Sequence, residues 1–253
     1  MDARTYGIGA DRGCQEWIDW MLIVTREALR VTRGLVLWVV GGVTRDRCYW
    51  PGPEGLLYSA WREGINCWRP AIWARVGIPG SGGDQWLRSD TEYCLAFTRE
   101  PKISFADNLV NGSPPKYRPG GAMAYRDRDG NRKTDGSTKR AADGTMKKMT
   151  YAGVDIANPG NVIHIPVGGG VIGDALSHES EAPYPEKLAE FFVLGWCQPG
   201  GIVYDPFSGS GTTAKVAAVN GRKFIASDIR LSQCELTRRR LNSITPVALY
   251  REA

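Results

Sequence analysis

A run of small and acidic residues near the C-terminus has the composition of a nucleoside-binding turn. It reads Val203-Tyr-Asp205-Pro-Phe-Ser-Gly209-Ser-Gly211-Thr-Thr213, and Asp228 follows further along the chain. Glycines let a backbone approach its ligand closely, and the free amides of a helix N-terminus attract a negative group. A carboxylate such as Asp228 can accept ribose hydroxyls, each charge-assisted hydrogen bond contributing about 1.5–3 kcal/mol.

The elements around this turn are those of a Rossmann-like α/β fold. We expect strands at 202–204 and 224–227, with helices at 185–198, 212–220 and 232 onward. In such folds the nucleoside lies across the carboxyl ends of parallel strands. The alternation therefore predicts a nucleoside site after residue 204.

The N-terminal part of the chain carries the same alternation. Apolar residues at helical spacing predict a helix over 15–32, and Leu35 to Val40 form a continuous apolar run. Such a run suits a strand buried on both faces, as in a parallel sheet. A helix at 54–63 and strands at 67–75 and 93–99 should follow, with Pro70 interrupting the first of these strands.

Other glycine-turn sites fit less well. A phosphate-binding P-loop needs a lysine before Ser or Thr, and Gly211-Thr212-Thr213 has none. The dinucleotide fingerprint needs a further glycine three residues after Gly211. A plain tight turn stays open as the alternative without function.

Composition limits the class of protein. The chain has 253 residues, 42% of them apolar, which is enough for a core. Its longest apolar run, residues 35–40, is far shorter than a membrane span, and no secretory signal is recognisable. Six scattered cysteines without a Cys-x-x-Cys pair favour reduced thiols and a cytoplasmic location, and they argue against a metal site.

The positive charge is concentrated in one segment. Between Arg118 and Thr150 nine Lys or Arg face four Asp, which gives +5 and equals the net charge of the whole chain. This segment lacks Val, Ile, Leu, Phe and Trp, so it is expected to be a flexible basic loop.

The turn resembles a family motif. Residues 205–213, DPFSGSGTT, are similar to the S-adenosylmethionine motif of amino-methylating DNA methyltransferases, which modify N6 of adenine or N4 of cytosine. His178 to Leu188, with Ala-Pro-Tyr-Pro inside, resembles the preceding block of the β-type, circularly permuted members. Two such blocks in order indicate a site-specific, phage-like DNA methyltransferase with a permuted Rossmann-like sheet, in a phage or restriction–modification setting.

The resemblance implies S-adenosylmethionine as cofactor. Thr212 and Thr213 would meet its methionine end, and Asp228 would hold its ribose. The residues implied to contact it are Asp205, Pro206, Phe207, Gly209, Gly211, Thr212, Thr213, Asp228, Pro183, Tyr184 and Pro185.

The catalytic turn of this family, Asp/Ser-Pro-Pro-Tyr/Phe, is not found before the first helix. Arg4-Thr-Tyr-Gly7 resembles the stretch that follows it in phage-type relatives, so the chain is expected to begin just past that motif, as a fragment with little activity. Its strand would then be missing between the strands at 35–40 and 202–204. Ser113-Pro-Pro-Lys-Tyr117 is interpreted as a proline-rich loop, and no catalytic residue is assigned.

The resemblance also divides the chain. Residues 1–100 correspond to the catalytic half, 101–175 to the target-recognition region with the basic loop 118–150, and 176–253 to the cofactor half. Double-stranded DNA is the implied partner, with RNA less favoured, and a homodimer stays open. Phosphate contacts are expected from Arg126, Arg128, Arg132, Lys133, Lys139, Arg140, Lys147 and Lys148. The alternative is a catalytically silent remnant that binds DNA or cofactor.

Overall fold

The computed structural model describes residues 13–75, 84–85, 87–115, 125–133, 138–140, 143–148, 154–168, 172–180 and 182–244. The stretch Arg4 to Gly7, used above to place the start of the chain, lies outside them. The described residues belong to two compact units: one within 1–107 and 160–253, the other within 108–159.

The first unit contains a five-stranded mixed sheet in the order β1-β6-β5-β11, with β4 also paired to β6. Its strands are β1 (Val36–Val40), β4 (Asn66–Cys67), β5 (Ala71–Ala74), β6 (Thr91–Thr98) and β11 (Val162–His164). The first four pair antiparallel through β6, and β11 runs parallel to β5. Pro70 separates β4 from β5, as the sequence predicted.

Strand β1 is covered on both faces. Val36 and Trp38 pack into one hydrophobic cluster, whereas Leu37 and Val39 pack against another. This confirms the prediction of a doubly covered strand. The implied parallel neighbour is wrong, because β1 pairs antiparallel with β6. A continuous apolar run reports burial of both faces and not the direction of the neighbouring strand.

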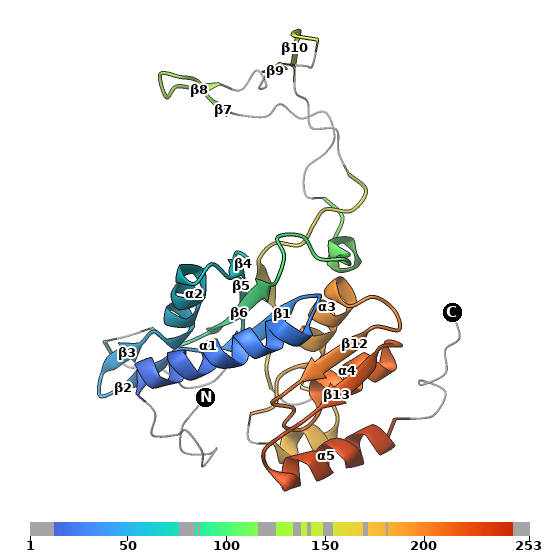
Figure 1. Cartoon of the computed structure of the whole chain (residues 1–253). Coiled ribbons are helices and arrows are strands. Elements are labelled where there is room, and N and C mark those ends of the chain that lie inside the picture. Colours follow the sequence, from blue (N-terminus) through green and yellow to red (C-terminus); the bar gives the residue numbers. More distant parts are fainter. Residues whose placement is uncertain are drawn as a thin grey trace. The chain divides into compact units, whose positions relative to one another are not determined.

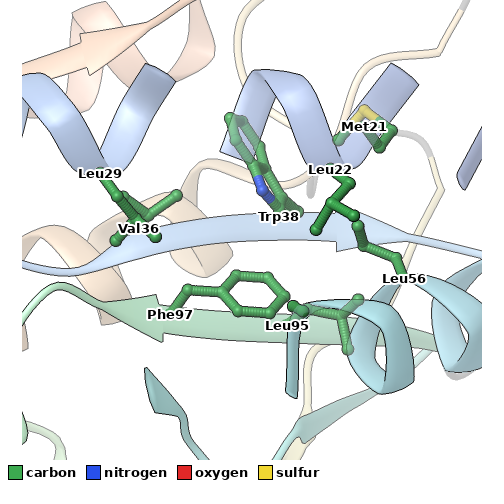
Figure 2. Close-up of a cluster of buried hydrophobic side chains, with 9 residues drawn as sticks. Met21, Leu22, Leu29, Val36, Trp38, Leu56, Leu95 and Phe97 are labelled. Carbon is green, nitrogen blue, oxygen red and sulfur yellow. The ribbon is translucent and has the colours of Figure 1, made fainter. Parts of the chain in front are cut away.

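The first cluster lies between this sheet and two helices, α1 (Cys14–Val31) and α2 (Gly52–Arg62) (Figure 2). Leu56, Leu95 and Phe97 are completely buried, and full burial of such a side chain contributes about 1.5–3 kcal/mol. The Trp38 indole donates to the Thr25 hydroxyl at 2.9 Å, so its polar atom is satisfied inside the cluster. A short hairpin, β2 (Val43–Arg45) and β3 (Cys48–Trp50), joins β1 to α2.

The C-terminal part of this unit holds a second, smaller sheet. Strands β12 (Ile202–Asp205) and β13 (Lys223–Ala226) pair parallel. Three helices accompany them: α3 (Glu186–Trp196), α4 (Thr212–Val219) and α5 (Leu231–Asn242), preceded by the 3-10 helix η2 (Ala175–Glu179). Helix α4 contacts both strands as well as α3 and α5 (Figure 1). This is the strand–turn–helix–strand–helix order that the sequence predicted.

The second unit has little regular structure. It contains the 3-10 helix η1 (Asn108–Asn111) and two small antiparallel ladders: β7 (Tyr125–Arg126) with β8 (Arg132–Lys133), and β9 (Thr138–Arg140) with β10 (Met146–Lys148). Ser113 bridges to Ala157, which closes the segment at its base. The sequence had predicted an unstructured basic loop, and its described parts instead contain these two ladders.

Candidate functional site

The glycine turn occupies the carboxyl end of β12, where the sequence placed it. Gly211 caps α4 with a left-handed φ of 76°, and a Cβ there would lie 2.7 Å from the Thr237 methyl group. Both the dihedral and the close approach of α5 therefore require glycine. The Gly209 amide donates to the Asp228 carboxylate at 3.0 Å, which ties the turn to the end of β13.

Asp205 and Tyr184 meet at Thr213. The Thr213 hydroxyl is hydrogen-bonded to the Tyr184 hydroxyl and to the Asp205 carboxylate, which also accepts from the Phe207 amide at 3.0 Å. Burial raises the pKa of Asp205, and the nearby charge of Asp228 adds to this against the hydrogen bonds. Burial and the charge of Asp205 likewise raise the pKa of Tyr184. Tyr184, Thr213 and Asp205 thus form a continuous polar surface. The carboxylates of Asp205 and Asp228 are close enough to interact, an arrangement that favours a cation beside them.

The segment before α3 contributes Tyr184 to this polar surface. Pro185 is buried and is the N-cap residue of α3, while Pro183 and Tyr184 are partly buried. The structure thus brings Tyr184 and the threonine end of the turn together, as the predicted pairing of the two sequence blocks requires.

Phe207 connects the turn to the N-terminal part of the unit. Its ring lies 5.8 Å from that of Trp20 on α1 and 6.0 Å from that of Trp38 on β1. Phe207 as a whole stays 42% exposed despite these ring contacts. Pro206, which precedes it, is partly buried.

Asp228 accepts two backbone amides, one on each carboxylate oxygen. One oxygen accepts from the Gly209 amide, and the other accepts from the Arg230 amide at 2.9 Å. A carboxylate has about four acceptor sites, so capacity for a further donor is left. Asp205 is the last residue of β12, and Asp228 lies two residues after the end of β13, the adjacent parallel strand.

A charged cluster behind the turn was missed by sequence reasoning. Arg240 of α5 is fully buried and donates to Asp174, Glu186, Ser210 and Thr212. The Thr212 hydroxyl, predicted to meet the cofactor's methionine end, lies 2.8 Å from the Arg240 guanidinium. In the sequence Arg240 ends a run of three arginines, which is typical of an exposed helix face. The only signal was its i, i+4, i+7 spacing with Gln233 and Thr237.

The basic segment presents cations in opposed pairs. The ladder registers place Arg126 opposite Arg132 and Lys139 opposite Lys147. Arg126 and Arg132 therefore carry like charges at directly opposite positions, which repel each other. Arg126, Arg128 and Arg132 are exposed, whereas the side chains of the other five predicted contacts, Lys133, Lys139, Arg140, Lys147 and Lys148, lie outside the described set.

Two local turns build these ladders. The Asp127 carboxylate accepts from the amides of Asp129 and Asn131 at 3.0 and 2.8 Å. Asp143 accepts from the amide of Thr145 at 2.9 Å. Asp-Gly turns of this kind form hairpins without a hydrophobic core, which explains why composition alone predicted a loop.

The comparison with family models decides the family. A model described as "DNA methylase" matches residues 3–239. The chain belongs to the DNA methylase family. Within the part of the chain that the structure describes, no group of three His, Cys, Asp or Glu could hold a metal, and no helix could cross a membrane.

Named DNA methylases resemble parts of the chain. The orphan methyltransferase M.BamHII of Bacillus amyloliquefaciens is 47% identical over 70 residues, 28% of this chain and 26% of that protein. The DNA adenine methyltransferase YhdJ of Escherichia coli K12 is 38% identical over 84 residues, which are 33% of this chain and 28% of that protein. The type II methyltransferase M.BglII of Bacillus subtilis is 25% identical over 86% of this chain and 55% of its own length. The chain thus spans between about a quarter and about half of these curated relatives.

Solved structures of DNA methyltransferases share the fold of this chain. The PvuII DNA methyltransferase, described as cytosine-N4-specific, superposes with a TM-score of 0.67 at 16% identity, over 95% of this chain and 76% of that one. A protein described as a putative DNA modification methylase from Thermus thermophilus, in complex with S-adenosyl-L-methionine, superposes with a TM-score of 0.51 at 21% identity. The superposition covers 88% of this chain and 76% of that one. The mixed α/β fold is therefore that of a DNA methyltransferase.

Proposed function

We propose that this chain is the cofactor-binding and DNA-contacting part of a β-type, permuted DNA methyltransferase that methylates adenine N6 or cytosine N4. The observation that carries the proposal is the turn 205–213 in a chain of the DNA methylase family. The turn begins with Asp205 at the carboxyl end of β12, and its Gly209 amide is bound to Asp228, which follows the parallel strand β13. The order of the chain's parts supports the permuted type, because β1 precedes the cofactor turn in sequence.

S-adenosylmethionine fits the donor and acceptor set of this turn. The cofactor is cationic, and Asp205 is a partly buried carboxylate close to Asp228. Asp228 would accept the ribose hydroxyls, and the exposed part of Phe207 would border the ligand. Thr213 and Tyr184 would close the other side. When bound, the cofactor supplies an electrophilic methyl group on its sulfonium.

The base-orienting turn would lie on a further strand between β1 and β12. Among the described residues β1 has β6 as its one partner strand, and β12 has β13. Ile202, Tyr204 and Ile225 share one face of the smaller sheet by register and are 62%, 47% and 55% exposed. Open edges next to an uncovered apolar face support the proposal that an additional segment pairs and packs here.

Double-stranded DNA would be held by the basic segment. Arg126 and Arg132 would contact phosphates, which relieves their mutual repulsion and releases counterions. Lys139 and Lys147, which are opposite each other in backbone register, would add further phosphate contacts. Such contacts position a duplex without reading its sequence.

Transfer of labelled methyl groups to DNA tests the proposal. The 253-residue chain should bind S-adenosylmethionine but transfer little label. A version extended upstream through an Asp/Ser-Pro-Pro-Tyr turn should transfer it, and an extended version with alanine at the first residue of that turn should not. Transfer by the 253-residue chain alone would refute the proposal that the base-orienting turn lies on a further strand. Binding without transfer in both versions would favour a silent binding protein.

A further inference from the structure

Helix α5 presents an unusual buried face to the cofactor turn. Gln233, Thr237 and Arg240 recur at one helical stripe and are 7%, 6% and 0% exposed. A core-facing stripe is normally apolar, and a buried polar group is costly unless it is hydrogen-bonded. These side chains therefore need a structural or functional reason to be there.

Two of the three bind the backbone of the turn. The Thr237 hydroxyl donates to the Gly209 carbonyl at 3.0 Å. Arg240 donates to the Ser210 carbonyl at 3.3 Å and to the hydroxyls of Ser210 and Thr212 at 3.2 and 2.8 Å. The backbone of the turn is thus held by side chains of α5.

Two carboxylates set the position of the Arg240 guanidinium. Its Nε donates to Asp174 at 2.9 Å, and its second terminal nitrogen donates to Glu186. Lys215 donates to the same two carboxylates, at 2.6 and 2.8 Å. This cluster of two cations and two carboxylates therefore joins four elements: Asp174 at the N-cap of η2, Glu186 in α3, Lys215 in α4 and Arg240 in α5.

Charge balance keeps this cluster together. Burial raises the pKa of Asp174, but hydrogen bonds from Lys215 and Arg240 outweigh it and lower that pKa to about 2. Burial lowers the pKa of Lys215, but its bonds to Asp174 and Glu186 raise it overall. The charged forms of Asp174 and Lys215 are therefore stabilised by their partners in this cluster.

We propose that Arg240 is a positioning residue that holds the turn from Gly209 to Thr213 in its cofactor-binding shape. It acts through Ser210 and Thr212 without touching the cofactor. The inference rests on the proposed binding of S-adenosylmethionine at this turn. The planar five-donor guanidinium is needed because a lysine offers one point charge and cannot reach both carboxylates and both hydroxyls.

Equilibrium binding of S-adenosylmethionine, measured by calorimetry, tests this with a matched control on the same helix. Arg239 is the next residue, but it is exposed and pairs with an exposed carboxylate, Glu179. Arg240→Gln should weaken binding about tenfold or more, as loss of a supporting partner behind a binding group does. Arg240→Lys should recover part of this loss, and Arg239→Gln should change Kd less than about twofold.

A second readout separates positioning from general stability. Backbone hydrogen exchange of residues 207–213 should accelerate in Arg240→Gln, while exchange in β1 and β6 should stay unchanged. If Arg240→Gln does not fold, Asp174→Asn removes one of the two carboxylates that bind the Arg240 guanidinium and should show the same pattern more weakly. A lower melting temperature with unchanged Kd and unchanged exchange in the turn would overturn the proposal.

The two claims fail in different ways. If the unaltered chain does not bind S-adenosylmethionine, the proposed function fails. If it binds but Arg240→Gln binds equally well, the function stands and the positioning role of Arg240 fails.

Discussion

The cofactor turn and the basic segment use the same local chemistry in opposite settings. Both place a left-handed glycine beside an aspartate that accepts backbone amides: Gly209 is bound to Asp228 in one, and Gly144 follows Asp143 in the other. In the cofactor turn, buried side chains of α5 fix the backbone from behind. In the described part of the basic segment, Gly130 and Gly144 are exposed, and Asp127 and Asp143 accept amides from residues two to four positions away. If the proposed function holds, the first region is preorganised for a small cofactor, and the second offers positive charge to an extended polyanion.

The largest difference between the two regions should appear on adding a methyl group to each glycine. At Gly211 an alanine would have to adopt a left-handed backbone conformation, and its Cβ would lie 2.7 Å from a Thr237 atom. At Gly144 the backbone is also left-handed, but a Cβ would have no neighbour within 4 Å. Gly211→Ala should cost about 2–3 kcal/mol and weaken S-adenosylmethionine binding about 100-fold. Gly144→Ala should cost about 1 kcal/mol locally and leave that binding unchanged.

Calorimetric titration of both variants checks this contrast. Equal losses of affinity would show that the cofactor turn is no more constrained than the hairpin turn.

Removing an opposed cation pair should act only on DNA. Arg126→Ala with Arg132→Ala should lower duplex affinity about 30-fold near physiological salt and reduce the salt-dependence slope by about 2, because two phosphate contacts are lost. Arg30→Ala with Arg239→Ala, on exposed arginines of helices α1 and α5, is the charge-matched control. Fluorescence anisotropy at several salt concentrations measures both. An unchanged slope would exclude phosphate contacts by this ladder.

The pH dependence of cofactor binding should follow Asp205. Its pKa is raised by burial, and a cationic cofactor binds better to the ionised form. Affinity should therefore fall as pH drops through that raised pKa, by at most about tenfold per pH unit. Asp205→Asn should bind weakly at all pH values and lose this dependence. A dependence that persists in Asp205→Asn would assign it to another group.

The smallest effect is expected at the contact between the turn and the N-terminal part of the unit. Phe207→Leu keeps an apolar side chain but loses the ring contacts with Trp20 and Trp38, which contribute about 0.5–1.5 kcal/mol. Cofactor affinity should fall a few-fold, and thermal unfolding should shift slightly. A loss of about 100-fold, near 2.7 kcal/mol, would mean that Phe207 contacts the ligand more extensively than its partial exposure indicates.

Sequence reasoning predicted the elements better than their partners. The helix at 14–31, the strand at 36–40 and the cofactor turn lie where periodicity and turn chemistry placed them. The antiparallel pairing of β1 with β6 could not be read, since an apolar run carries no information on direction. The Asp-Gly pairs at 129–130 and 143–144 indicate hairpin turns in the basic segment, but the prediction of a loop rested on composition and did not use them. Arg240 was hidden because its partners Asp174 and Glu186 are remote in sequence.

The most direct test of the account is a titration of the isotope-labelled chain with S-adenosylmethionine, followed by backbone amide resonances. The account predicts saturable shifts at Gly209, Gly211 and Thr213 and at Asp228, with the amides of Asp127 to Asn131 unmoved. Saturable shifts confined to residues outside 183–228, or no shifts at millimolar cofactor, would contradict a cofactor site at this turn.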